Sequence, residues 1–175
     1  ALPIWSACFR RLWLRRVFPR PARHRAGRHL QRLLGQGASG HIHEALLTVG
    51  GNTSRLALKL FKGAVTSDGL PRCELAVSLA AGRHPHLVGV LGRVGDHPSG
   101  IPALVMALIP PDFVNLAGPP SLASCTRDIY PDGVRFTPAA LLNLAQGVVS
   151  AVRHLHGRGI LHGDLYAHNL LHSGQ

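Results

Sequence analysis

Cysteine, aromatic residues and long apolar runs are all scarce in this sequence. Its three cysteines, Cys8, Cys73 and Cys125, are widely spaced and form no C-x-x-C pair, so they indicate reduced thiols in a cytoplasmic protein rather than a disulfide framework. The longest apolar run, Ile101 to Pro111, is interrupted by prolines. A membrane-spanning helix needs ~20 apolar residues, and we therefore expect no transmembrane segment.

Acidic residues are also few, eight against nineteen lysines and arginines, which gives a net charge of +11. The first 32 residues hold nine arginines and no acid, whereas residues 33–175 carry ten basic and eight acidic side chains. A nucleic-acid-binding face needs basic residues within the folded part, often beside stacking aromatics. Only 5% of the chain is aromatic, and we expect no specific nucleic-acid partner.

The chain is long and apolar enough for one domain with a core, at 175 residues of which 46% are hydrophobic. Residues 1–28 stand apart as a basic leader or linker. They fit an organelle transit peptide, a membrane-surface patch, or the remnant of an upstream domain, and we favour the remnant. Because the sequence opens on Ala1 and closes on Gln175, we expect it to be part of a longer protein.

A glycine-rich stretch follows a strand-like run that starts at His29. Residues 35–40 read G-Q-G-A-S-G, with Ile42 two places later. The same G-x-G-x-x-G spacing serves dinucleotide-binding sites, where it leads from a strand into a helix. Residues 42–49 instead carry apolar and β-branched side chains and end at a Gly-Gly-Asn turn, which predicts a hairpin. Such a hairpin can lie over a triphosphate, although an ordinary hairpin also fits.

A lysine lies inside the apolar strand predicted for Arg55–Phe61. The chain has only two lysines, and a buried ammonium such as that of Lys59 needs an anion. The next segment, Pro71–Ala81, is predicted to be a helix ended by Gly82. Its only acid, Glu74, either pairs with Lys59 or faces solvent in the first turn, where the helix dipole favours it. We favour the ion pair.

The middle of the chain predicts two strands and a long loop. The run His84–Gly92 is typical of a turn that leads into a strand. Metal ligation by His84 and His86 is possible on spacing alone, but no third ligand is placed. Ile101–Ile109 is predicted to be a buried strand, and the five prolines of residues 110–136 indicate a loop or insertion.

The last part of the chain predicts a long helix and a polar loop. Thr137 is a plausible N-cap, and the glycines at 157 and 159 end the helix. One helical face is apolar and predicts a core helix; it comprises Leu141, Leu144, Ala145, Val148, Val152 and Leu155. Ile160–Leu161 is predicted to be a short strand that leads into the loop. There Asp164 and Asn169 can converge on one substrate, an arrangement suited to phosphoryl transfer.

Six elements, in order and spacing, resemble those of the eukaryotic-type protein kinases: the glycine loop, the L-A-L-K strand, the Glu74 helix, the H-P-H-L-V turn, the Met106 strand and the loop H-G-D-L-Y-A-H-N. The loop H-G-D-L-Y-A-H-N is similar to the corresponding loop of bacterial kinases attached to leucine-rich repeats. The resemblance implies an α+β fold with an antiparallel small lobe, one helix packed on it, and the first part of a mainly helical large lobe. It assigns 29–109 to the small lobe, 110–136 to a hinge and insertion, and 137–175 to the start of the large lobe.

The resemblance also implies site residues, with ATP and magnesium as cofactors. Asp164 and Lys59 would be catalytic, Glu74 the partner of Lys59, and Asn169 both catalytic and a magnesium ligand. Met106 would guard the back of the adenine pocket. The implied ATP-binding residues are Leu34, Gly35, Gln36, Gly37, Ala38, Ser39, Gly40, Ile42, Ala57, Lys59, Met106, Ala107 and Ile109.

Departures from the kinase pattern leave alternatives open. Gly163 replaces the arginine that pairs with a phosphorylated activation loop, and Tyr166 replaces a lysine beside the γ-phosphate, where His168 is a candidate to compensate. The expected function is a serine/threonine-type protein kinase with an unknown protein substrate. An aminoglycoside-type phosphotransferase also has the H-G-D form, and a nucleotide-binding pseudokinase is the third reading. No D-F-G follows, so we expect an inactive fragment.

Overall fold

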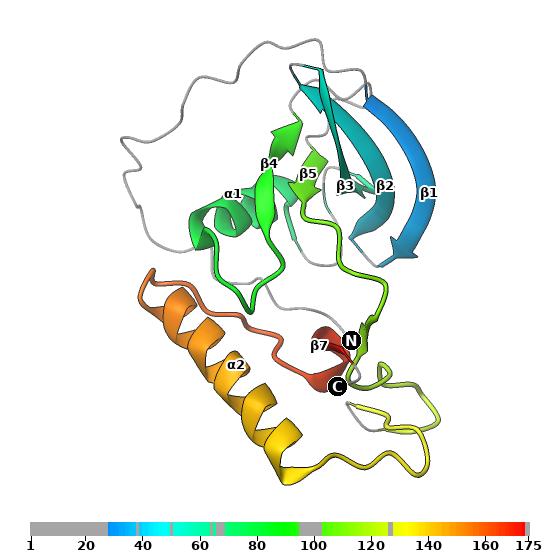
Figure 1. Cartoon of the computed structure of the whole chain (residues 1–175), viewed down its shortest axis with the longest axis vertical. Helices are drawn as coiled ribbons and strands as arrows, with labels where there is room; N and C mark the ends of the chain where they lie inside the picture. The colour runs from blue at the N-terminus through cyan, green and yellow to red at the C-terminus, as the bar shows by residue number, and fades with distance from the viewer. Residues whose placement is uncertain are drawn as a thin grey trace.

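The computed structural model describes residues 28–173 except 38, 50, 64, 66–68, 95–102 and 126–127, so residues 1–27 of the basic leader lie outside the described part and its last residue, Arg28, begins a strand. A five-stranded sheet with helix α1 lies at one end of the molecule (Figure 1). Helix α2 and a two-stranded ribbon lie at the other end, and the chain that leaves β5 connects the two ends (Figure 1).

The large sheet is antiparallel throughout, in the order β1-β2-β3-β5-β4. Its strands are β1 (Arg28–Gln36), β2 (Gly40–Val49), β3 (Asn52–Phe61), β4 (Val90–Val94) and β5 (Ala103–Met106). The glycine loop connects β1 to β2, so the predicted hairpin is present. An antiparallel sheet with helices after it is the fold class expected from the sequence.

Both faces of the sheet contribute to a core. Leu56 and Leu58 on β3 pack with Ala45, Val94 and Ala103 on one face. On the other face, Leu104 packs with Phe61 of β3 and Leu75 of α1. Burying a side chain such as leucine stabilises the fold by about 1.5–3 kcal/mol, and these contacts fix α1 against the sheet.

Helix α1 (Pro71–Ala81) has the bounds that the sequence predicts. Pro71 occupies the first helical position, where its missing N–H costs nothing. Gly82 follows the last turn with φ of 69°, a backbone conformation that favours glycine. Because the first turn carries Glu74 and the helix packs beside β4, this carboxylate is held next to the sheet.

Helix α2 (Pro138–His156) also begins and ends where the sequence predicts. The Thr137 hydroxyl accepts a hydrogen bond from the Ala140 N–H at 3.1 Å. The core-helix prediction holds only in part, since Leu141 is 49% exposed and the buried side of the helix consists of Gly147, Ala151 and Leu155. Among the described residues, α2 therefore buries only a narrow row of positions spaced four residues apart.

Two histidine contacts connect α2 to the sheet end of the molecule. His154 Nε2 donates to the Ala81 carbonyl at 2.7 Å, at the end of α1. His84 Nε2 lies 3.1 Å from Ser150 Oγ, and His84 Nδ1 accepts from the His86 N–H at 3.2 Å. Both ring nitrogens of His84 therefore face protein partners, which gives no support to metal ligation by His84 and His86.

Two strand predictions need correction. Of the predicted strand Ile101–Ile109, residues 101–102 lie outside the described part, and β5 ends at Met106 rather than at Ile109; the next N–H, that of Ala107, donates to the Gly89 carbonyl at 2.7 Å in the turn before β4. Ile160–Leu161 forms no strand, since the Ile160 N–H closes the end of α2 on the Leu155 carbonyl at 3.0 Å. The short ribbon instead pairs β6 (Phe113–Asn115) with β7 (Leu171–Ser173).

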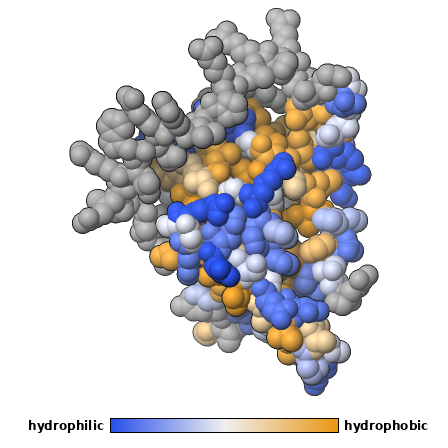
Figure 2. All heavy atoms as spheres, turned by 60° about the vertical axis from the view of Figure 1, so that its left-hand side comes forward, coloured by the Kyte–Doolittle hydropathy of each residue, from blue (hydrophilic) through white to orange (hydrophobic). Residues whose placement is uncertain are grey.

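Apolar groups remain at the surface of the described part. Val149 and Leu161 are 66% and 68% exposed, and Figure 2 shows apolar side chains lying between polar ones on one face. Single exposed apolar residues are ordinary in globular proteins. Among the described residues no helix has the length and apolarity to cross a bilayer.

Gly40 provides a test of the sheet packing. A Cβ built there would lie 2.3 Å from the Leu60 carbonyl oxygen, so Gly40→Ala must displace β2 from β3. We expect this variant to lose about 1–3 kcal/mol in the free energy of unfolding, measured by denaturant titration. Gly92→Ala on β4 is the control, because nothing lies within 4 Å of its added Cβ. Equal stability of the two variants would contradict the close approach.

Candidate active site

Lys59 and Glu74, which are 15 residues apart in the sequence, meet across the sheet and α1. Lys59 Nζ lies 2.5 Å from Glu74 Oε1, and only 16% and 12% of the two side chains are exposed. The ammonium also lies 5.3 Å from the centre of the Phe61 ring. The structure thus brings together the lysine and the acid that the sequence pattern pairs.

The glycine loop closes tightly between β1 and β2. The Gly37 N–H donates to the Gly40 carbonyl at 3.0 Å, and the Ser39 carbonyl accepts from the Lys62 N–H at 3.1 Å. Ser39 and Gly40 are buried in this turn, whereas Leu34 and Gln36 are exposed. Ala38, also predicted to bind ATP, lies outside the described residues.

Three other predicted ATP contacts lie on neighbouring parts of the sheet. Ile42 on β2 is the register partner of Lys59, and Ala57 on β3 is the register partner of Met106 on β5. Beyond β5, the Ala107 N–H is engaged with Gly89, and Ile109 is 38% exposed. The predicted adenine-side residues therefore form a continuous set from β2 to the linker after β5.

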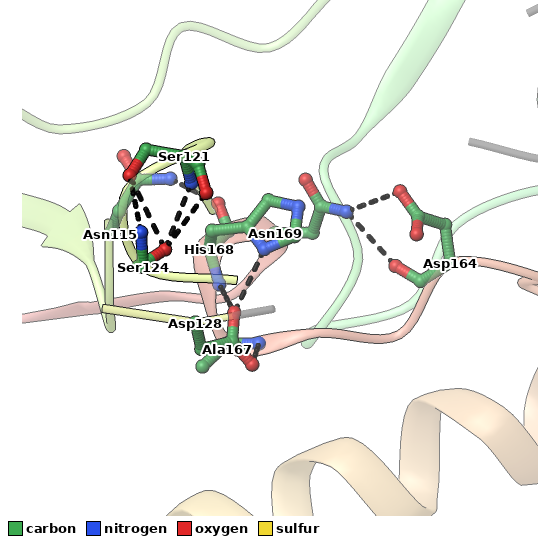
Figure 3. Close-up of polar contacts among 8 residues, drawn as sticks. All are labelled: Asn115, Ser121, Ser124, Asp128, Asp164, Ala167, His168 and Asn169. Atoms are coloured by element: carbon green, nitrogen blue, oxygen red, sulfur yellow. Dashed lines mark hydrogen bonds and ion pairs between the residues drawn. The ribbon is translucent and has the colours of Figure 1, made fainter. Parts of the chain in front are cut away.

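Asp164 and Asn169 close the polar loop on itself (Figure 3). Asn169 Nδ2 donates to Asp164 Oδ2 at 2.8 Å and to the Asp164 carbonyl at 3.0 Å. Asp164 is 7% exposed, and the neutral amide of Asn169 holds its carboxylate in place. Figure 3 shows the Asn169 Oδ1 on the side of the amide away from Asp164.

The donor chemistry of this loop suits magnesium, which prefers carboxylate and amide oxygens. Asn169 Oδ1 and the Asp164 carboxylate are such oxygens. Within the described ranges, no group of three or more histidine, cysteine, aspartate or glutamate residues could hold a metal. Asn169 Oδ1, the predicted ligand, would therefore supply one oxygen of a magnesium site, and other groups such as phosphates would have to supply the rest.

The Lys59–Glu74 pair and the Asp164–Asn169 pair remain separate, and in the described part of the chain no hydrogen bond or ion pair joins them. A cavity of about 730 Å³ lies between the end of α1, the turn before β4, the linker and α2. Ala107, Ile109 and Asn169 line it, but Lys59 and the glycine loop do not. Among the described residues, this apolar space therefore meets the predicted nucleotide site at the linker and at Asn169.

His162 lies two residues before Asp164 on the same loop. Burial lowers the pKa of His162 below its ordinary value of 6.5, and the neighbouring Asp164 only partly opposes this. The Asp164 N–H donates to His162 Nδ1 at 3.4 Å, which requires an unprotonated Nδ1. Gly163 between them has φ of 77°, so the residue that replaces the kinase arginine sits where glycine is favoured.

Sequence reasoning missed two residues that hold this loop, Asn115 and Asp128. Asp128 Oδ1 lies 2.8 Å from His168 Nδ1, and Asn115 Nδ2 donates to the His168 carbonyl at 2.6 Å. The His168 ring stacks on Tyr166, with centroids 5.7 Å apart and planes 8° from parallel. Nothing in the local pattern distinguishes Asp128 from Asp132 in the same segment, so no sequence signal could have found it.

The Lys59–Glu74 contact can be tested with a double-mutant cycle of Lys59→Met and Glu74→Gln. Because both side chains are largely buried, we expect a coupling free energy of about 1–3 kcal/mol in unfolding measurements. The matched control is the Arg55–Glu44 pair, which is 2.6 Å apart but leaves 65% of the arginine side chain exposed. A Lys59–Glu74 coupling no larger than that of the exposed pair would contradict the assignment.

His162 should make stability depend on pH. Since its pKa is lowered on folding, the unfolded chain binds the extra proton first as pH falls below 6.5, and the free energy of unfolding decreases there. We expect His162→Gln to flatten the stability profile between about pH 7 and 5. His156→Gln, at an exposed position, is the control. His84, whose pKa is lowered by desolvation and by its cationic neighbours, acts in the same direction in both variants.

Comparison with known families agrees with this geometry. The family model described as protein tyrosine and serine/threonine kinase matches residues 28–175, which include the glycine hairpin, the Lys59–Glu74 pair and the Asp164 loop. No curated protein matches the chain. Because the family match covers most of the sequence, the chain belongs to the protein tyrosine and serine/threonine kinase family.

Proposed function

We propose that this chain forms the nucleotide-binding part of a protein kinase, of serine/threonine type, that transfers the γ-phosphate of ATP to a protein hydroxyl. The observation that carries the proposal is the ion pair between Lys59 and Glu74. Lys59 lies on β3, which pairs with strand β2 of the glycine hairpin. An ammonium fixed in this way offers a compact positive charge beside backbone N–H groups that approach phosphates closely. The family match supports phosphotransferase chemistry with ATP and magnesium.

Each site residue has a role in this proposal. Lys59 binds the α- and β-phosphates, with Glu74 orienting its ammonium. Met106 and the backbone of Ala107 and Ile109 border the adenine, together with the glycine-loop residues. Asp164 accepts or orients the proton of the attacking hydroxyl.

Magnesium belongs to the proposed site through Asn169 Oδ1. When bound, the ion neutralises phosphate charge. The neighbouring Asp164 carboxylate stays oriented because Asn169 Nδ2 donates to it. One side chain thus holds the carboxylate through its nitrogen and presents its oxygen to the cation.

The proposed organisation divides the chain into a small lobe, residues 29–109, a hinge and insertion, 110–136, and the start of a large lobe, 137–175. We place the protein in the cytoplasm, with ATP and a protein substrate as partners. A glycine hairpin over the nucleotide favours a protein kinase over an aminoglycoside phosphotransferase, which shares the H-G-D form. A phosphorylation assay on protein substrates and on an aminoglycoside separates these two functions.

We expect residues 1–175 alone to bind magnesium-ATP weakly without turning it over, because among the described residues no group of three or more histidine, cysteine, aspartate or glutamate side chains could hold the ion. Lys59→Met should weaken nucleotide binding about tenfold, since it removes a charge-assisted contact. Binding is measured by fluorescence titration with a nucleotide analogue, and turnover by phosphate release beside Asp164→Ala. Arg55→Met on the same strand is the binding control. Turnover that depends on Asp164 would show that the 175 residues suffice, and no binding at all would contradict the proposed function.

A further inference from the structure

The backbone of His168 is held at both of its polar groups by the segment 110–136. Its carbonyl accepts from Asn115 Nδ2 at 2.6 Å, and its N–H donates to Asp128 Oδ1 at 3.0 Å. Asn115 ends β6, and Asp128 lies further along the same segment (Figure 3). A residue 40 positions away in the sequence from Asp128 is thus fixed by a loop that carries none of the predicted site residues.

Asp128 supplies a cap that the loop itself lacks. The short helix η1 (Ala167–Asn169) starts after Tyr166, whose side chain makes no capping bond. The first N–H groups of a helix have no partner inside it, and Asp128 takes both: Oδ2 accepts from Ala167 at 3.1 Å and Oδ1 from His168. Desolvation alone would raise the pKa of Asp128, but these bonds and the His168 side chain lower it overall, as expected for an ionised cap.

The same carboxylate fixes the His168 ring. An ionised carboxylate can only accept, so His168 Nδ1 must carry a proton to bond Asp128 Oδ1 at 2.8 Å. Only 10% of the His168 side chain is exposed, and the ring lies flat against Tyr166. Tyr166 occupies the position where serine/threonine kinases place a lysine. Asp128 therefore acts on that position through the His168 ring, which stacks on Tyr166.

The geometry of η1 determines where Asn169 lies. The Asn169 N–H donates to the Tyr166 carbonyl at 2.9 Å, so Asn169 completes the turn whose first residues Asp128 caps. From this position its side chain reaches Asp164. Beyond it, the Leu170 carbonyl accepts from the Leu116 N–H at 2.8 Å, which ties the exit of the turn to the same segment.

We propose that Asp128 is a positioning residue that sets Asn169 against Asp164 through η1, and that the segment 110–136 thereby controls the geometry of the phosphoryl-transfer loop. The structural half of this inference stands on the hydrogen bonds alone. Its catalytic half rests on the proposed function. Two separate measurements distinguish them.

Amide hydrogen exchange on the 175-residue chain tests the structural half. Asp128→Asn replaces one of the two acceptor oxygens by an NH2 donor and removes the charge that strengthens the remaining bonds, so exchange at Ala167, at His168 or at both should accelerate roughly tenfold or more. Asp128→Glu should restore part of the protection. Asp132→Asn, an exposed acid of the same segment, is the control. Exchange of the α2 amides reports global unfolding. If it also accelerates in Asp128→Asn, the exchange rates at Ala167 and His168 are compared with those in Asp128→Glu. Unchanged exchange at both amides would overturn the inference.

Steady-state kinetics on the complete kinase test the catalytic half. With Asn169 misplaced, Asp128→Asn should lower kcat about tenfold or more while the KM for ATP changes less than threefold, because the adenine and phosphate contacts lie elsewhere. Asp128→Glu should recover part of kcat, whereas Asp132→Asn should leave it unchanged. An unaltered kcat together with accelerated amide exchange would overturn the proposal that Asp128 controls catalysis through η1. A wild-type protein without turnover would refute the proposed function instead, and the exchange result would then decide the positioning role alone.

Discussion

An ammonium on an apolar strand is the constraint on which the rest of the small lobe depends. Lys59 is flanked by leucines on β3, and a cation in such a place is stable only beside an anion. Glu74 provides that anion, but only if α1 lies across the sheet with its first turn against β3. The apolar contacts of Leu75 with Phe61 and Leu104 hold the helix in that position. Packing and charge thus require the same placement of one helix, and neither alone would orient the lysine so narrowly.

The second half of the site is organised by different forces. The loop from His162 to Asn169 has no buried apolar anchor of its own except Ala167, which packs with Leu116 and Ala117. Hydrogen bonds supply the remaining order, from the capping carboxylate of Asp128 and the amide of Asn115. A loop held mainly by polar contacts with a single distant segment can be reshaped by changing that segment, without any change in the sheet. The two halves of the site are therefore held by different kinds of contact.

Sequence reasoning succeeded where single residues dictate the backbone. Proline at position 71 and glycine at 82 bound α1, and Thr137 begins α2, because ring geometry, positive φ and a capping hydroxyl act locally. The lysine in an apolar strand likewise predicts an anionic partner nearby. Strands of three residues such as β6 and β7 carry too little periodicity to be recognised. Asp128 and Asn115 act across some 40 to 53 residues, and no local pattern encodes such a contact. The strand predicted at Ile160–Leu161 is the opposite error. The apolar pair suggests a strand, but Leu161 is largely exposed to solvent.

The hydrogen bond from the Ala107 N–H to the Gly89 carbonyl also limits how the two ends of the molecule can pivot. It ties the first residue after β5 to the turn before β4, so Ala107 moves with the sheet. Pro110 and Pro111 follow, each with φ fixed by its ring, and the residue before a proline is itself restricted. Leu108 is then the residue of this linker whose two dihedrals are both unrestrained. Between the sheet and the ribbon of β6 and β7, the backbone is thus locally free at few dihedral angles.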